Sequence, residues 1–212
     1  MKSCHYLAWA CALGLGAGCT STSVSYYTLT PPAVEPAMAR GAPIAVDVRV
    51  LHIPASLNRS ELTVRRGPTG LVILENERWA SPLRDEIKDA VRGEIERRLG
   101  SAGENLQSVS RLRLDIDVQR FEAALGQDVK VDAAWRLTLQ PAAQEHTEPR
   151  SIACDFHDVQ KIGPAYGEMV QGFQTLMATL ADAVVAALVT PQPGGADPCQ
   201  PLPAHSNSTP RG

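Results

Sequence analysis

The sequence predicts an α+β domain: a two-layer sandwich with a mostly antiparallel sheet and two helices packed on it. Three observations lead to this prediction. Short stretches that alternate apolar and polar residues come in two groups of three, each group precedes a stretch with helical spacing, and the links within a group are too short for parallel crossovers. The predicted order is therefore β-β-β-α, twice, with each element burying its apolar face against the other layer.

The first group of strands begins the domain. Residues 44–50 alternate strictly and end before Pro54. Two shorter strands, at 62–64 and 71–74, flank a turn rich in Gly and Pro at 67–70. This group supplies half of the predicted sheet.

The first helix follows these strands. Ser81 is its expected N-cap and Pro82 its first residue, and Gly100 ends it. One face of the helix carries apolar residues at helical spacing: Leu83, Ile87, Val91, Ile95 and Leu99.

The second group repeats the pattern. Residues 111–119 and 129–139 form the clearest alternating strands, residues 151–159 form a weaker one, and a long helix covers 166–188. This helix is the most apolar stretch of the domain. Asp182 and two glutamines on its polar side favour a core helix over a membrane span, because a carboxylate costs about 2.5–3.5 kcal/mol at a bilayer centre.

Composition excludes several classes of protein. Of the 212 residues, 44% are hydrophobic and 5% aromatic, and 20 Lys and Arg stand against 23 Asp and Glu. These values are unlike those of a collagen, a disulfide-dense mini-protein or a wholly disordered chain. The net charge of −3 gives no broad positive field, so we expect no nucleic-acid partner.

The N-terminus is predicted to be a lipoprotein signal peptide, residues 1–18. Its apolar core at 6–15 is too short to cross a bilayer, and small residues then lead into Cys19. This ending resembles a bacterial lipobox, although Gly16 stands where Leu is usual. The resemblance implies that Cys19 is lipidated and that the chain is cut before it. An ordinary signal peptide with an incidental Cys19 is the alternative.

The segments that flank the domain differ from it in composition. Residues 19–43 hold the lipidated Cys and a Ser, Thr and Pro-rich stretch, predicted to be a flexible tether with an r.m.s. reach of roughly 25 Å. Residues 190–212 are predicted to be a disordered Pro-rich tail, which leaves 44–189 as a single α+β domain. Thr20, not Asp, follows Cys19, and the lipoprotein sorting pattern that this resembles implies the outer membrane.

Two further thiols remain in the mature chain, Cys154 and Cys199. In an exported protein they either pair in a disulfide that ties the tail to the domain or both stay free.

The sequence gives no sign of a catalytic or metal site. It contains no G-x-S-x-G, H-E-x-x-H or Walker-type motif. Cys154 and His157 would point to opposite faces of one strand and so would not converge on a metal ion. We therefore expect no enzyme activity, no metal and no cofactor.

Four motifs occur in order along the chain. The lipobox at Cys19 is followed by Tyr-Tyr-Thr-Leu at 26–29, by a strand that runs into Ile-Pro-Ala-Ser-Leu-Asn-Arg at 53–59, and by Trp-Ala-Ser-Pro-Leu at 79–83. Together they resemble the PqiC/YmbA family of ABC-type transport auxiliary lipoproteins, although Asn58 stands where that family commonly has Asp.

The resemblance implies a lipid-anchored protein on the periplasmic face of the bacterial outer membrane. Its role would be that of an auxiliary or docking component of an MCE-type ABC system for intermembrane lipid transport. The implied partners are the MCE-domain tunnel protein of the inner membrane, the outer-membrane lipid bilayer through acylated Cys19, and further copies of the chain in a ring. A structural lipoprotein that supports another outer-membrane or secretion complex is the alternative.

Two of these motifs contain conspicuous side chains that are candidates for partner contact: Pro54, Leu57, Arg59 and Trp79. A strand-ending turn and a buried structural Trp would explain the same residues without a partner.

Overall fold

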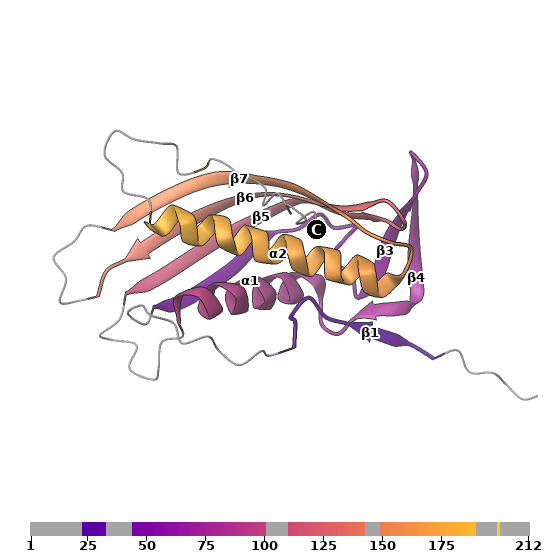
Figure 1. The fold of residues 1–212 in the computed structure, drawn as a ribbon, viewed down its shortest axis with the longest axis horizontal. Coiled ribbons are helices and arrows are strands. Elements are labelled where there is room, and N and C mark those ends of the chain that lie inside the picture. The colour runs from indigo at the N-terminus through magenta and orange to yellow at the C-terminus, as the bar shows by residue number, and fades with distance from the viewer. Residues whose placement is uncertain (1–22, 33–43, 101–109, 143–148, 190–198, 200–212) are drawn as a thin grey trace, which may run out of the picture.

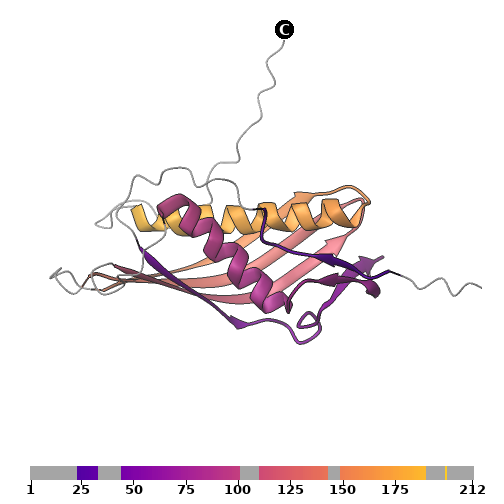
Figure 2. The same ribbon diagram turned by 90° about the horizontal axis from the view of Figure 1, so that it is seen from below.

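The structure, a computed structural model, is described here for residues 23–32, 44–100, 110–142, 149–189 and Cys199 (Figures 1 and 2). The predicted signal peptide, Cys19 and the predicted tail other than Cys199 lie outside these residues. The strands form two sheets, and both helices lie on one side of the larger sheet, as Figure 2 shows. The predicted α+β class is therefore confirmed, as is the β-β-β-α order that repeats after an additional first strand.

The larger sheet has four strands in the order β2-β5-β6-β7: β2 (Ala45–His52), β5 (Arg111–Ala124), β6 (Asp128–Gln140) and β7 (Arg150–Lys161). β2 runs parallel to β5, and the other neighbours are antiparallel. Successive side chains of a strand point to opposite faces, so the alternating sequence gives this sheet one buried and one exposed face. Leu112, Leu114 and Ile116 on the buried face are completely shielded from solvent.

The smaller sheet has three strands in the order β1-β4-β3: β1 (Ser25–Tyr27), β3 (Glu61–Arg66) and β4 (Gly70–Trp79). β3 and β4 form a hairpin, and Gly67 in its turn has a φ of 65°, which favours glycine. β1 pairs in parallel with the last three residues of β4. Periodicity predicted a single sheet because it shows which residues alternate but not which strands pair.

Helix α1 (Leu83–Leu99) begins one residue later than the sequence predicts. Pro82 is the N-cap and provides no side-chain cap, whereas the Ser81 hydroxyl donates to Glu86 at 2.8 Å. The helix ends as predicted, where the Gly100 N–H donates to the Glu96 carbonyl at 2.8 Å.

Helix α2 (Tyr166–Val189) is long and apolar enough to cross a membrane by length and composition. In the structure it instead lies along β6 and β7 beside α1 (Figure 1). Arg98 of α1 forms an ion pair with Asp182 and donates to the Ala178 carbonyl at 3.0 Å. The predicted core helix is therefore confirmed. Its buried side includes Met169, Phe173, Leu176, Met177 and Leu180.

Candidate functional site

The first described residues bring the chain from Cys19 onto the domain. Ser25, six residues after Cys19, begins β1 beside the end of β4. The Ala80 N–H donates to the Tyr27 carbonyl at 2.7 Å, and Leu29 is completely buried. This corrects the prediction that the whole of 19–43 is a flexible tether, because residues 25–29 belong to the domain. The apolar side chains of Tyr27 and Leu29 pack on the core. The average composition of residues 19–43 did not show this, because Ser, Thr and Pro dominate it.

Glu86, in the first turn of α1, binds the N-terminal segment to the helix through hydrogen bonds. Its carboxylate accepts four hydrogen bonds, from the Thr28 hydroxyl (2.8 Å), the Leu29 N–H (2.8 Å), the Ser81 N–H (3.0 Å) and the Ser81 hydroxyl (2.8 Å). Glu86 is only 4% exposed. Thr28, Leu29, Ser81 and Glu86 are together termed the N-terminal clamp.

The clamp satisfies a group that would otherwise be costly to bury. A carboxylate has about four lone-pair sites, and an unsatisfied buried charge costs several kcal/mol. The four donors occupy these sites, and the positive end of the α1 dipole adds favourable field. Gln174 of α2 provides a second attachment by donating to the Thr28 carbonyl at 3.0 Å. The N-terminal segment is therefore fixed to both helices.

The sequence did not reveal the role of Glu86. An acidic residue in the first turn of a helix is explained by the helix dipole alone. Its partners Thr28 and Leu29 lie 58 and 57 residues away in the chain, so no local motif reports the contact.

Trp79 lies inside the domain and not on its surface. The residue is 4% exposed, and its ring makes edge contacts with Phe121 of β5 and Phe173 of α2, with ring centroids 6.3 and 6.4 Å away. Phe121 and Phe173 stack on each other at 3.9 Å. Because its side chain is buried, Trp79 is not part of a partner-contact surface as predicted. It instead packs between the smaller sheet, the larger sheet and α2.

The other three predicted contact residues lie on the loop between β2 and β3. The Leu57 N–H donates to the Pro54 carbonyl at 2.9 Å, and the Arg59 Nε donates to the Ser56 carbonyl at 3.0 Å. Pro54, Leu57 and Arg59 are all partly exposed. The structure thus brings these three together on an ordered turn, and their role in binding a partner stays a prediction.

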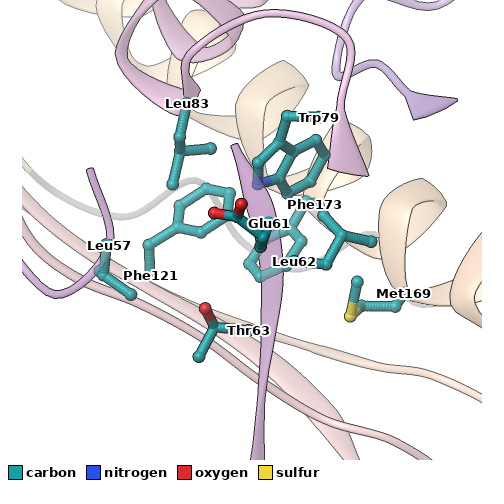
Figure 3. Close-up of a pocket in the computed structure, with 9 residues that line it drawn as sticks. All are labelled: Leu57, Glu61, Leu62, Thr63, Trp79, Leu83, Phe121, Met169 and Phe173. Carbon is teal, nitrogen blue, oxygen red and sulfur yellow. The ribbon is translucent and has the colours of Figure 1, made fainter. Parts of the chain in front are cut away.

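Two hollows adjoin this loop. The first, shown in Figure 3, holds about 10 Å³, which is room for roughly one water molecule, so it is a packing joint and not a ligand site. Its lining residues are Leu57, Glu61, Leu62, Thr63, Trp79, Leu83, Phe121, Met169 and Phe173. The second holds about 140 Å³ between the loop, the hairpin and β5, and it is lined in part by Pro54 and Leu57. Arg65 and Glu122, which also line it, form an ion pair at 2.5 Å.

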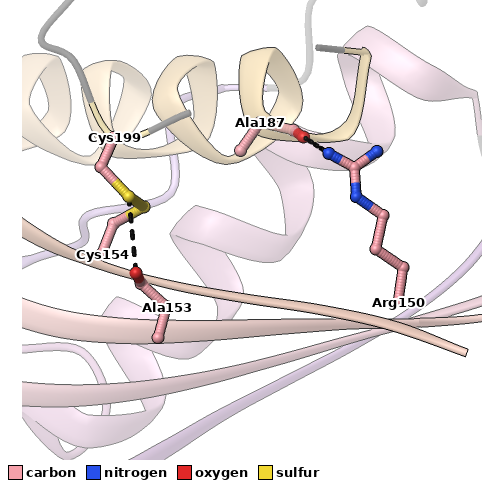
Figure 4. The surroundings of a disulfide bond; sticks show 5 residues. All are labelled: Arg150, Ala153, Cys154, Ala187 and Cys199. Carbon is pink, nitrogen blue, oxygen red and sulfur yellow. Dashed lines mark hydrogen bonds between the residues drawn. A yellow bond between two sulfur atoms is a disulfide. The ribbon is translucent and has the colours of Figure 1, made fainter. Parts of the chain in front are cut away.

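Cys154 of β7 and Cys199 are joined in a disulfide, which Figure 4 shows beside α2. The Cys199 sulfur lies 3.4 Å from the Ala153 carbonyl oxygen. Nearby, the Arg150 guanidinium donates to the Ala187 carbonyl at 3.2 Å, at the negative end of the α2 dipole. Of the two alternatives that the sequence left open for these thiols, the structure has the bridge, which closes a loop of 45 residues.

The part of the chain that the structure describes contains no candidate metal site. Within those ranges, no three His, Cys, Asp or Glu side chains form a group that could hold a metal ion.

Comparison with known proteins identifies the family. The family model described as "ABC-type transport auxiliary lipoprotein component" matches residues 27–185, from β1 to α2. The chain belongs to this family. Membership makes it an auxiliary lipoprotein of an ABC-type transport system, anchored to a membrane of the cell envelope. A comparison with curated protein sequences finds no match.

A solved structure supports the fold of this auxiliary lipoprotein. The crystal structure of an uncharacterised protein is 18% identical, with a TM-score of 0.57, over 79% of this chain and 99% of that chain. A Xanthomonas campestris protein of the family model DUF330 is 14% identical, with a TM-score of 0.46, over 77% and 90%. Rare lipoprotein B from Shewanella oneidensis is 10% identical, with a TM-score of 0.33, over 69% and 93%. The last two are too distant to support an argument.

Proposed function

We propose that this auxiliary lipoprotein is anchored to the outer membrane by acylated Cys19, faces the periplasm and acts as a docking component of an MCE-type ABC system for intermembrane lipid transport. In this role it catalyses no reaction. The observation that carries the proposal is the family match over residues 27–185, which includes the N-terminal clamp, the larger sheet and α1, and most of the smaller sheet and of α2. The motifs at 26–29, 53–59 and 79–83 support the MCE-type assignment by resemblance.

The N-terminal clamp supports a docking role in particular. Because β1 is fixed to the domain, only residues 20–24 lie between Cys19 and Ser25. Six residue steps span at most about 20–22 Å when fully extended. A domain held this close to its lipid anchor would keep the end of a tunnel protein next to the bilayer. The expected partner is the inner-membrane MCE-domain protein, with further copies of the chain completing the docking structure.

Affinity purification of the intact lipoprotein from membranes dissolved in a mild detergent tests the partner. We expect an MCE-domain protein among the recovered chains. Arg59→Glu, on the β2–β3 loop, should reduce its recovery several-fold, whereas the matched change Arg113→Glu, on the exposed face of the larger sheet, should leave it unchanged. Recovery of a secretin or pilus component with no MCE-domain protein would instead support the structural lipoprotein of another complex.

The anchor has a separate test. Cys19→Ala should abolish labelling by palmitate and release the domain into the soluble periplasmic fraction. If that variant still sediments with outer-membrane fragments, the proposed lipidation of Cys19 is wrong.

A further inference from the structure

The smaller sheet exposes large apolar side chains at the end of the molecule where β1 begins. Leu71 and Ile73 of β4 are 51% and 47% exposed, and Tyr26 of β1 is 66% exposed. These three residues are together termed the apolar rim. Val24, just before β1, is also exposed. Apolar groups gathered in this way commonly mark a contact with another molecule or with a membrane.

Strand register places Leu71 and Ile73 of the apolar rim on one face of the smaller sheet. Residues opposite each other in register share a face, and residues two apart on a strand do so as well. Ile73 lies opposite Thr63, while Tyr26 lies opposite Arg78, which lies opposite Glu61. Leu71 and Ile73 are two apart on β4 and share a face, while Tyr26 lies beyond an irregularity of β4, because Leu62 pairs with Leu74 but Glu61 pairs with Arg78.

The turn of the hairpin carries one cation and no carboxylate, and the first carboxylate of β4 after the turn is the exposed Glu75. From Arg66 to Leu74 the sequence reads Arg-Gly-Pro-Thr-Gly-Leu-Val-Ile-Leu, which contains one cation and no carboxylate. Anionic headgroups attract Lys and Arg at close range, by about 1 kcal/mol for each residue. A phospholipid surface that approaches this hairpin would therefore meet an attractive charge together with apolar side chains.

Chain length indicates what covers the apolar rim. Ser25 lies six residues from Cys19, a distance of at most about 20–22 Å. The N-terminal clamp and the pairing with β4 fix β1 to the domain, so acyl chains on Cys19 would keep this end within that distance of the membrane. Figures 1 and 2 both show β1 beginning at the end that carries the β3–β4 hairpin. A lipid surface that holds Cys19 would thus lie within reach of the rim.

The backbone of β4 limits how deep the contact can be. β3 pairs with one edge of β4, and among the described residues no strand pairs with the other edge from 70 to 76. Unpaired backbone groups are costly in hydrocarbon, so the hairpin must stay where water reaches it. Aliphatic side chains can still enter the boundary of the acyl region, and a Tyr ring suits the headgroup level.

We propose that the apolar rim is a membrane contact: Tyr26, Leu71 and Ile73 insert at headgroup depth into the phospholipid surface that holds Cys19, and so orient the domain on the bilayer. This inference rests on the proposed lipidation of Cys19, but it does not depend on the MCE-type partner.

The test uses the lipidated full-length mature protein in vesicles of phosphatidylcholine and phosphatidylglycerol. Ile73→Cys carries a nitroxide in one sample, and Leu51→Cys carries it in the matched control, because Leu51 is a similarly exposed leucine, 58%, on the larger sheet. The introduced thiol reacts selectively, since Cys154 and Cys199 form a disulfide and Cys19 is acylated. Accessibility to dissolved oxygen and to a water-soluble nickel chelate reports whether each label lies in lipid or in water.

We expect the ratio of oxygen to nickel accessibility to be several-fold higher at position 73 than at position 51. Adding Tyr26→Ser and Leu71→Ser should lower that ratio at 73, with a circular dichroism spectrum like that of the parent as proof of folding. Equal ratios at 73 and 51, or a label at 73 shielded from both reagents by a second copy of the chain, would overturn the proposal. Failure of the lipidated protein to stay on the vesicles would overturn it too, because the anchor would then not hold the domain at the membrane. A lipid-exposed label at 73 together with no recovered MCE-domain protein would overturn only the proposed function.

Discussion

The two sheets of this protein differ in the side chains that dominate their exposed faces, although the larger sheet also exposes Leu51 and Val159. On the exposed face of the larger sheet, Arg49 pairs with Asp115 at 2.5 Å and Arg113 with Asp47 at 3.6 Å, across neighbouring strands. The smaller sheet instead exposes the apolar rim. Charges that pair across strands are stable in water, whereas exposed apolar groups gain free energy when they are covered. The broad charged face is therefore a solvated surface, and the contact lies at the end near the lipid anchor.

The sheets also differ in how they are held. Both helices pack on the larger sheet, while the smaller sheet joins the body through Trp79, the Arg65–Glu122 ion pair and the N-terminal clamp. Several of the contacts that join the smaller sheet to the body can therefore be removed by single substitutions.

The largest effect is expected from Trp79→Ala. Removing a buried Trp should lower the free energy of unfolding by about 3–5 kcal/mol, because the ring leaves a cavity between β4, β5 and α2. Denaturant unfolding followed by circular dichroism measures the change. A decrease in the free energy of unfolding of less than about 0.5 kcal/mol would contradict the burial of Trp79, since removing a surface Trp costs little.

Removing the disulfide should weaken the edge of the larger sheet. The bridge closes a loop of 45 residues, and its loss through Cys154→Ala and Cys199→Ala should lower the free energy of unfolding by about 2–4 kcal/mol. Thermal unfolding with and without a reductant measures it. Reductant should destabilise the parent and leave the double variant unchanged; equal sensitivity of the two proteins would show that the bridge is not formed in solution.

Glu86→Gln should release the N-terminal segment while the larger sheet stays folded. The amide of Gln has the shape of the carboxylate, but its NH2 group cannot accept hydrogen bonds from Thr28, Leu29 and Ser81. We therefore expect the free energy of unfolding to fall by about 1–3 kcal/mol. Limited cleavage by chymotrypsin near Tyr26 should become several-fold faster. The control is Glu96→Gln, a partly exposed glutamate of the same helix, which should cleave like the parent. Equal rates in both variants would mean that the clamp does not hold the segment.

The smallest expected effect is the pH dependence of the stability that Glu94 of α1 contributes. Burial raises the pKa of Glu94, but hydrogen bonds and charges from Arg97 and Arg98 outweigh it and leave the pKa below its usual value. A lowered folded-state pKa gives stability that is present above the unfolded pKa of about 4.5 and lost as pH falls through the folded pKa.

The variant Glu94→Gln lacks the stability that the ionised Glu94 carboxylate contributes. Its deficit in the free energy of unfolding, about 1 kcal/mol at pH 7, should shrink as the pH falls below about 4.5. Denaturant unfolding at a series of pH values measures it. A deficit that stays constant down to pH 3 would show that the ionised carboxylate is not what stabilises the fold.

Most of the fold could be predicted from the sequence, because local periodicity determines which residues a strand or helix buries. Residues 111–119 and 83–99 are clear examples, since each repeats its apolar pattern over many residues. β1 was missed because its two tyrosines are surrounded by Ser, Thr and Pro, and its pairing partner lies far along the chain in β4. Long-range pairing leaves no local signal.

The candidate site was harder to predict for the same reason. The sequence marked Pro54, Leu57, Arg59 and Trp79 as conspicuous, but a motif does not show whether a Trp side chain points inward. The apolar rim joins residues from two strands that pair only in the folded protein. Cys19 is the exception, since its signal is entirely local, and its lipidation stays a prediction.

Amide hydrogen exchange at Leu29 tests most directly whether the anchor-side segment is part of the domain. In the intact protein the Leu29 N–H donates to the buried carboxylate of Glu86 at 2.8 Å. A clamped segment predicts that this amide exchanges orders of magnitude more slowly than in an unfolded peptide of the same sequence, and that Glu86→Gln removes most of the protection. Exchange at the peptide rate in the parent protein would mean that residues 25–29 are a free tether, and it would remove the fixed orientation on which the membrane contact depends.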